Sequence, residues 1–268
     1  MRSFIALIVL CLSVLSTPAY SEVQSLSQAI NESGRLRMLS QRMAKSKLLS
    51  AMEIQPEKAQ VQYRDSLALF KKNLVDLIIF SDQVDQSGSM NVQLKQIQSA
   101  LQAFTNISEN YDITPLIPNL LMTSDQLLMQ CETLVTELEN IANRRSAKWV
   151  NLSGRQRMLS QRIAKLYTAI ALSKDETHKA DLQQAVQEFE SALNQLISSP
   201  DNTQFVRYKL NNVLTQWNFS KQGFLALEKG QSTPLVISIT TESILKQMND
   251  ITALYQEIDL NKTRLAAN

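Results

Sequence analysis

A fifteen-residue phrase occurs twice in this chain, 120 positions apart, and constrains the fold more than any other feature. The first copy, NESGRLRMLSQRMAK, covers residues 31–45, and the second, NLSGRQRMLSQRIAK, covers residues 151–165; twelve of the fifteen positions are identical. Core packing tolerates exchanges of similar volume, so packing alone would not keep serine, glutamine, arginine and lysine unchanged. The repeat therefore divides the chain into two homologous units and marks one site in each.

The N-terminal segment has the pattern of a secretory leader. A basic start at Arg2 precedes a mostly apolar run over residues 4–15, and Ala19, Tyr20 and Ser21 are typical of a cleavage site. We expect residues 1–21 to be a signal peptide, which makes the mature chain periplasmic or secreted; an uncleaved N-terminal anchor is the alternative. No later stretch is long and apolar enough to span a membrane.

Charge and cysteine content exclude several function classes. Without Arg2 the chain has 26 basic and 25 acidic residues, a balance that argues against nucleic-acid binding. Basic residues instead gather at the two phrases. Cys131 is the only cysteine after the leader, so no internal disulfide can form. We expect it to be a buried thiol on an apolar stripe.

Apolar residues follow a helical period almost throughout, and only five glycines and six prolines occur, which predicts an all-α fold. In the first unit we expect helices over about 23–54, 57–80, 89–108 and from Pro118 onward. The expected core stripes are Leu67, Phe70, Leu74, Leu77 and Ile78; Ile97, Leu101 and Phe104; Leu127, Cys131, Leu134, Leu138 and Ile141; and, in the second unit, Val186, Phe189, Leu193, Leu196 and Ile197; and Ile244, Met248, Ile251, Tyr255 and Ile258. This pattern favours two tandem up-down four-helix bundles, over residues 22–145 and 146–268.

The junction between the units lacks strong helix breakers. From Asn119 to Ser173 there is no proline, and Gly154 is the only glycine. This predicts one long shared helix, a rod of roughly 80 Å, that joins the two bundles. Both phrases should then lie near the interface between the bundles and point in opposite directions.

Placed on a helix, each phrase has a polar face and a separate arginine beside its glycine. The polar faces are Asn31, Arg35, Met38, Arg42 and Lys45 in the first copy, and Asn151, Arg155, Met158, Arg162 and Lys165 in the second. Arg37 and Arg157 point away from these faces, on the flank of Gly34 and Gly154 respectively.

A glycine inside a helix costs about 1 kcal/mol relative to alanine, and close approach of another backbone or of a small ligand is its usual compensation. Arginines beside such a gap are suited to small oxyanions or carboxylates. The residues leave a second interpretation open: the arginines pair with acidic residues of neighbouring helices, and the glycines permit a tight helix crossing.

The phrase Asn-x-Ser-Gly-Arg-x-Arg-Met-Leu-Ser-Gln-Arg-x-Ala-Lys resembles the signature of the PilJ-type domain, the N-terminal domain of type IV pilus chemotaxis transducers. That family is similar to the periplasmic sensor domains of nitrate/nitrite-responsive histidine kinases, whose P-box reads Asn-x-Ala-Gly-x-x-Arg-Met. The resemblance implies a four-helix sensor that binds nitrate at a symmetric dimer interface. By position, it implies binding through Arg37 and Arg157, with Gly34 and Gly154 supplying backbone donors. The chain departs from the nitrate sensors by the extra arginines Arg35 and Arg155.

We therefore predict an exported, non-enzymatic, sensor-type binding protein that recognises a small anion, either nitrate/nitrite-like or a carboxylate. The ligand-binding residues predicted are Asn31, Gly34, Arg35, Arg37 and Arg42, and Asn151, Gly154, Arg155, Arg157 and Arg162. Since one chain carries both motifs, an intramolecular pseudo-dimer would replace the homodimer of the related sensors; a homodimer of this chain is also left open. The rival hypothesis is a helical scaffold for a pilus, an envelope protein or a membrane receptor.

No cofactor, metal or catalytic set is predicted. His178 is the only histidine, and it has no cysteine or histidine companions at ligand spacing. No Ser/His/Asp or Cys/His set can be assembled, and no glycine-rich phosphate loop is present. Because no transmembrane helix or kinase follows the second unit, we expect signalling to require a separate membrane receptor.

Overall fold

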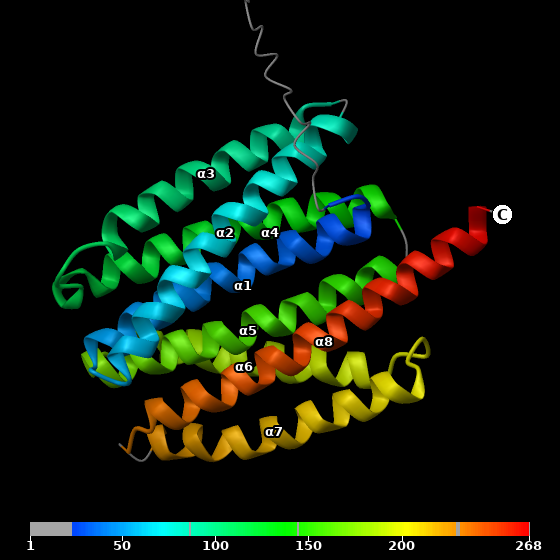
Figure 1. The fold of residues 1–268 in the computed structure, drawn as a ribbon. Coiled ribbons are helices and arrows are strands. Elements are labelled where there is room, and N and C mark those ends of the chain that lie inside the picture. The colour runs from blue at the N-terminus through cyan, green and yellow to red at the C-terminus, as the bar shows by residue number, and fades with distance from the viewer. Residues whose placement is uncertain (1–22, 86, 144, 229–230, 268) are drawn as a thin grey trace, which may run out of the picture.

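The computed structural model describes residues 23–85, 87–143, 145–228 and 231–267. Within these ranges the chain forms eight α-helices and two short 3-10 helices, and no strand (Figure 1). The all-α prediction is confirmed. The expected signal peptide, residues 1–21, lies outside the described residues.

Each half of the chain contains four long helices. The first half comprises α1 (Leu26–Ala51), α2 (Pro56–Val84), α3 (Ser89–Ser108), the 3-10 turn η1 (Thr114–Leu116) and α4 (Ile117–Ala142). The second half comprises α5 (Arg145–Ser173), the 3-10 turn η2 (Glu176–His178), α6 (Lys179–Ile197), α7 (Gln204–Glu228) and α8 (Pro234–Ala267). Successive helices alternate in direction (Figure 1), so each half is an up-down bundle.

The helix ends follow local sequence signals. The Ser25 side chain accepts a hydrogen bond from the Gln28 backbone N–H over 3.2 Å and caps α1. Pro56 opens α2, where a missing N–H costs nothing. Gly88 precedes α3 with a φ of 76°, a left-handed conformation that glycine adopts without strain.

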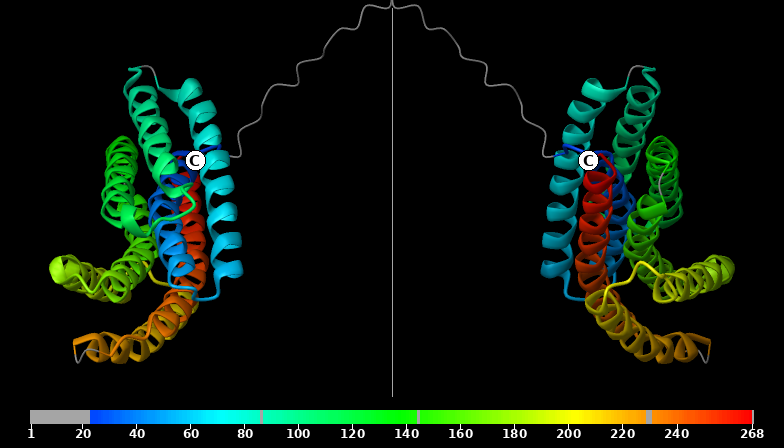
Figure 2. Two further views of the ribbon diagram at one scale, coloured as in Figure 1. Left: turned by 90° about the vertical axis from the view of Figure 1, so that its left-hand side faces the viewer. Right: turned by 90° about the vertical axis from the view of Figure 1, so that its right-hand side faces the viewer.

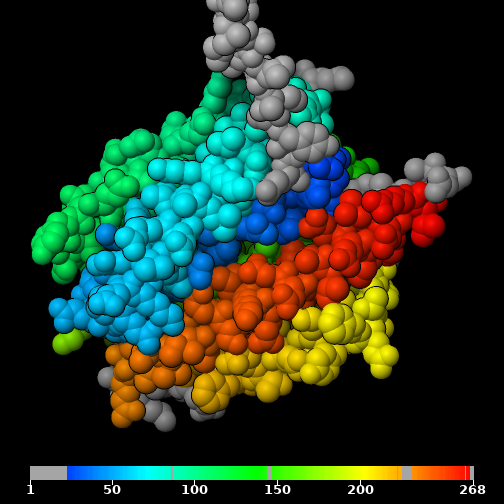
Figure 3. All heavy atoms as spheres, in the orientation of Figure 1, coloured from blue at the N-terminus to red at the C-terminus, as the bar shows by residue number. Residues whose placement is uncertain are grey.

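The helices α1 and α5 form the centre of the molecule. α1 packs against α2 and α4 of its own half and against α5, while α5 also packs against α6 and α8. Viewed along the helices, α3 and α7 lie at opposite ends of the cross-section (Figure 2). On the face drawn in Figure 3, α1, α2 and α8 cover α5 almost completely. Most residues of both phrases are buried.

The predicted stripes form the core. Most of the apolar side chains that the spacing placed inward are buried, among them Phe70, Phe104, Leu134, Phe189 and Met248. Five others pack against this core and are partly buried: Leu67, Ile78, Val186, Ile197 and Ile258. Cys131 is fully buried, and burial raises the pKa of its thiol far above the usual range. One prediction is wrong: Ile141 is 51% exposed, because the neighbouring Ala142 is the residue that faces the core in the last turn of α4.

The predicted continuous rod between the two halves does not form. α4 ends at Ala142, Asn143 adopts a left-handed conformation with φ 42° and ψ 40°, and α5 begins at Arg145. The Asn143 backbone N–H donates to the Glu139 carbonyl over 3.0 Å, as at a helix C-terminus. The chain reverses here, and α5 returns antiparallel to α4 (Figure 1).

Candidate ligand-binding site between α1 and α5

The two phrases lie side by side along the contact between α1 and α5. Gly34 faces Gly154, and further along the Lys45 ammonium donates to the Gln161 amide oxygen over 2.7 Å. The later residue of α1 contacts the later residue of α5, so the two phrases run in the same direction. The predicted opposite directions are wrong, because the turn at Asn143 reverses α5 relative to the expected rod.

The glycines make room for two guanidinium groups. A Cβ added to Gly34 would lie 3.3 Å from Nη2 of both Arg37 and Arg157. A Cβ added to Gly154 would lie 3.2 Å from Nη2 of Arg157 and 3.5 Å from Nη2 of Arg37. Both glycines are inside helices, where their N–H groups bond to carbonyls four residues earlier. They therefore supply space, and the expected backbone donors serve the helices instead.

Arg37 is completely buried and well partnered on one side. Its Nη1 donates to Glu132 Oε2 of α4 over 2.8 Å, and its Nη2 donates to Asn151 Oδ1 of α5 over 2.8 Å. The Asn151 amide in turn donates to Glu139 of α4. Arg37 is thus held by an ion pair within its own half and by the phrase of the other half.

Arg157 is equally buried, at 1% exposure, but it has no carboxylate partner among the described residues. Its Nη1 donates to Asn249 Oδ1 of α8 over 3.3 Å, and its Nη2 donates to the Asn31 backbone carbonyl over 3.1 Å. Burial, followed by repulsion from Arg35, lowers the pKa of Arg157 to about 9. At neutral pH the guanidinium remains a buried positive charge.

Several buried polar atoms around the two arginines have no hydrogen-bond partner. They are the Nε atoms of Arg37 and Arg157, Oδ1 of Asn31 and Oγ of Ser33. Buried polar groups are normally satisfied, so such a cluster calls for an explanation. Unpartnered arginine Nε–H groups are suited to donate to a small anion.

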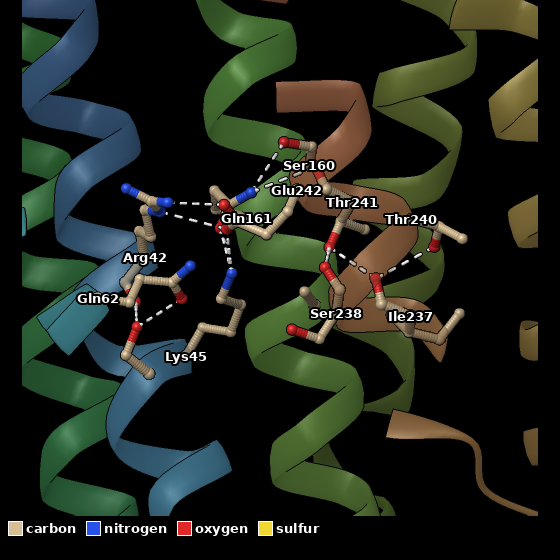
Figure 4. Close-up of polar contacts among 12 residues, drawn as sticks. Arg42, Lys45, Gln62, Ser160, Gln161, Ile237, Ser238, Thr240, Thr241 and Glu242 are labelled. Atoms are coloured by element: carbon tan, nitrogen blue, oxygen red, sulfur yellow. Dashed lines mark hydrogen bonds and ion pairs between the residues drawn. The ribbon is translucent and has the colours of Figure 1, made fainter. Parts of the chain in front are cut away.

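One turn further along, a second layer of ion pairs crosses between the halves. Figure 4 shows Arg42 and Lys45 of α1 pointing at Glu242 of α8. Arg42 Nε and Nη2 donate to the two Glu242 oxygens over 3.2 and 2.7 Å, and Lys45 also contacts Glu242. The equivalent Lys165 of α5 pairs with Asp125 of α4 over 2.6 Å.

The pKa values in this layer show the balance between burial and charge. Burial lowers the pKa of Lys45 to about 8 even though Glu242 opposes the shift. Burial also disfavours ionisation of Glu242, but Lys45 and Arg42 outweigh it and lower the pKa of the carboxyl to about 2. At neutral pH both Lys45 and Glu242 are charged. This ion-pair layer accounts for the identity of the lysine in the phrase.

The remaining predicted arginines lie away from the two glycines. Arg35 pairs with Glu32 over 3.0 Å on the flank of α1, and Arg155 pairs with Glu188 of α6 over 2.9 Å. Arg162 lies two turns along α5 from Gly154, near Lys165 and Glu188. The structure therefore brings together six of the ten predicted residues: Asn31, Gly34, Arg37, Asn151, Gly154 and Arg157.

The residues that face the phrases from α4 and α8 were not predicted. They recur every seven residues, as Asp125, Glu132 and Glu139 on α4, and as Glu242, Asn249 and Gln256 on α8. Each member contacts the corresponding phrase position; for example, Asn151 donates to Glu139 and Asn31 donates to Gln256 over 2.7 Å. The heptad spacing of polar residues on otherwise apolar helices was the available signal.

A surface cleft of about 820 Å³ adjoins this site. Asn151, whose amide oxygen holds Arg37, lies in its wall together with Glu139, Lys148, Trp149 and Arg155. The Trp149 indole stacks on Tyr255 with ring centroids 6.4 Å apart and donates to Asp201. The cleft connects solvent with the amide that contacts Arg37.

His178 pairs with Asp181 at 3.4 Å, and no group of three or more His, Cys, Asp or Glu side chains in the described ranges could hold a metal ion. None of the helices in the described part of the chain has both the length and the apolarity needed to cross a bilayer.

Comparison with known proteins gives a family match. A family model described as the type IV pili methyl-accepting chemotaxis transducer N-terminal domain, PilJ, matches residues 19–79 and 141–242. Each segment contains one copy of the phrase, and together they cover more than half of the chain. No curated protein and no solved structure gives a significant match.

Proposed function

Because the chain belongs to the PilJ family of chemotaxis-transducer N-terminal domains, a family of sensor-type domains, we propose that it binds a small oxyanion between Arg37 and Arg157. The family match supports a sensor-type, non-catalytic role. We infer the class of ligand, a small oxyanion, from the geometry of the site.

One observation carries the proposal: two fully buried guanidinium groups contact the same two glycine positions, and only one of them pairs with a carboxylate. An uncompensated buried charge costs several kcal/mol. A bound anion would supply the missing charge and accept the unused arginine donors. The ligand would therefore stabilise the fold and tighten the contact between α1 and α5.

The close packing around the two glycines favours a small ligand. The space beside each glycine is that of a missing methyl group, already in contact with guanidinium nitrogens at 3.2–3.5 Å. A planar anion of three or four heavy atoms, such as nitrate, nitrite or acetate, matches the fork of an arginine. We therefore expect small planar anions to bind in preference to bulky ones.

Both halves of the site come from one chain. Arg37 of α1 contacts Asn151 of α5, and Arg157 of α5 contacts Asn31 of α1. We propose that residues 22–145 and 146–268 are two PilJ-type units that form an intramolecular pseudo-dimer, with no need for a second copy. The leader pattern supports export to the periplasm, where a membrane receptor would read the ligand state.

A scaffold role is the second candidate, and a specific surface favours it. The side chains of Phe205, Tyr208 and Phe219 on α7 are 55%, 61% and 62% exposed, which is unusual for large aromatic residues. In this case the phrases would serve only to join the two halves, and α7 would contact an envelope protein.

Thermal unfolding of the mature chain distinguishes the two candidates. We would titrate nitrate, nitrite and acetate at constant ionic strength, with chloride as the control anion. A ligand at 100 times its dissociation constant adds about 2.7 kcal/mol to the free energy of unfolding. A selective rise of the unfolding midpoint with one anion supports the binding function. Identical unfolding curves with all anions would contradict it and favour the scaffold role.

A further inference from the structure

The two arginines of the site are capped by different residues. Glu132 of α4 holds Arg37 through a 2.8 Å ion pair, whereas Asn249 of α8 holds Arg157 through a 3.3 Å hydrogen bond. The first contact joins opposite charges, and the second is a long contact to a neutral amide. The site is therefore asymmetric although the phrases are nearly identical.

The difference is an exchange at equivalent positions. α4 and α8 correspond with an offset of 117 residues, since the glutamine Nε2 groups of the phrases donate to the carbonyls of Ser124 and Thr241, respectively. At this offset Glu132 corresponds to Asn249, and Glu139 corresponds to Gln256.

The acidic residue is retained where α4 and α8 meet the lysines. Lys165 pairs with Asp125, and Lys45 pairs with its equivalent, Glu242. α8 thus keeps the carboxylate that pairs with a lysine, Glu242. It has amides, Asn249 and Gln256, in place of the carboxylates that would face Arg157 and Asn31.

Other acidic residues do not fill the place of the missing carboxylate. Glu32 acts on Arg157 through space, but its Oε2 accepts from Arg35 over 3.0 Å and from Asn73 over 2.8 Å. Asn249 itself is exposed, so solvent reaches the amide that caps Arg157. An anion that replaced this exposed amide would therefore contact Arg157 from the α8 side.

We propose that Asn249 is the residue that determines ligand binding, because it leaves Arg157 without an internal counter-ion and so creates one anion site per chain, on the α8 side. At Arg37 the corresponding position is occupied by the carboxylate of Glu132, so Arg37 already has a counter-ion and needs no ligand. The proposal rests on the proposed function. It adds that each chain binds one anion and that this anion lies at Arg157, where it serves as the counter-ion that Glu132 provides for Arg37.

The test is the Asn249→Glu variant, which places on α8 the residue that α4 already has. We would measure nitrate binding to the full mature chain by titration calorimetry, and thermal unfolding without nitrate. We expect at least a tenfold loss of nitrate affinity and a higher unfolding midpoint in nitrate-free buffer, because the new carboxylate takes the place of the ligand. The wild-type chain should bind one nitrate.

Two further variants make the result specific. Ala253→Glu adds the same charge at an exposed position one turn away on α8, and it should change nitrate affinity less than twofold. Glu132→Gln removes the internal counter-ion of Arg37 and should increase nitrate affinity or the amount bound; it also serves as the test if Asn249→Glu does not fold.

The outcomes separate this inference from the proposed function. If the wild-type chain binds nitrate and Asn249→Glu binds it equally well, the role of Asn249 is wrong and the anion site stands. If Ala253→Glu loses as much affinity as Asn249→Glu, general charge repulsion replaces the specific role. If the wild-type chain binds neither nitrate, nitrite nor acetate, the proposed function fails, and this inference fails with it.

Discussion

Gly34 of α1 and Gly154 of α5 face each other so closely that a Cβ on Gly34 would lie 3.9 Å from the Cα of Gly154. The space that the two missing side chains leave is occupied by the ends of two arginines, one from each half of the chain. A helix-interior glycine costs about 1 kcal/mol relative to alanine. The repeat retains this cost at both positions, which is reasonable if the guanidinium groups must lie there.

Alanine at either glycine should separate stability from ligand binding. In Gly34→Ala or Gly154→Ala the new methyl group would lie 3.2–3.3 Å from Arg157 Nη2, so the guanidinium must move by a few tenths of an ångström. The gain in helix propensity offsets the crowding, and we expect the free energy of unfolding to change by less than about 1 kcal/mol. Nitrate affinity, measured by calorimetry, should fall at least tenfold. Unchanged affinity in both variants would show that the position of the two guanidinium groups beside the glycines has no role in binding.

Loss of Glu242 should be more damaging than loss of its equivalent on α4. Glu242→Gln leaves the fully buried Lys45 without a carboxylate and removes one of the two oxygens that accept from Arg42, so we expect a cost of about 3 kcal/mol or more. Asp125→Asn is the matched variant. Asp125 is 42% exposed and pairs only with Lys165, so its loss should cost less. Chemical denaturation of both variants measures the two losses of unfolding free energy. A larger loss for Asp125→Asn than for Glu242→Gln would contradict this prediction.

The same carboxyl predicts part of the acid sensitivity of the fold. Its pKa is lowered from 4.5 to about 2, so its contribution to stability is complete above pH 4.5 and disappears as the pH falls toward 2. The difference in unfolding free energy between the wild-type chain and Glu242→Gln should therefore shrink over this interval, by about 3 kcal/mol at most. Urea denaturation at several pH values tests this. A difference that stays constant from pH 5 to pH 2.5 would show that the carboxyl is not ionised against Lys45.

The fold was largely predictable because its core stripes are regular. Phe70, Leu77 and Phe104 are buried where helical spacing placed them. The reversal after α4 was missed because its turn contains neither glycine nor proline. Asn143 ends the helix in a left-handed conformation, which asparagine tolerates better than most residues. Without that turn, the directions of the two phrases could not be predicted correctly.

The candidate site was predictable only in part. The resemblance pointed to the six residues around the glycines, but not to their partners on α4 and α8. The sequences of the two halves align with an offset of 119 at Thr114 and Thr233, whereas α4 begins at Ile117 and α8 at Pro234, an offset of 117. The 3-10 turn η1 accounts for the shift. If the offset of 119 is applied to α4 and α8, Glu132 corresponds to Ile251. The replacement of this glutamate by Asn249 in the second half is then not recognised.

The first half alone should form a homodimer. Residues 23–143 would expose the phrase on α1, but two copies can restore the interface: Lys45 of one copy would meet Asp125 of the other, as Lys165 does in the intact chain. We expect sedimentation equilibrium to show a dimer that dissociates when Lys45 is changed to Glu. A stable monomer would mean that each bundle is complete without the pseudo-dimer.

The most direct test of the anion site is the double variant Arg37→Ala, Arg157→Ala. We would compare its thermal unfolding with that of the wild-type mature chain, with and without nitrate, nitrite and acetate at constant ionic strength. Arg157 has no carboxylate to leave unpaired and Glu132 is 36% exposed, so the variant should stay folded. We predict that the wild-type midpoint rises with at least one of these anions and that the midpoint of the variant does not. An equal rise in both proteins would contradict anion binding between the two arginines.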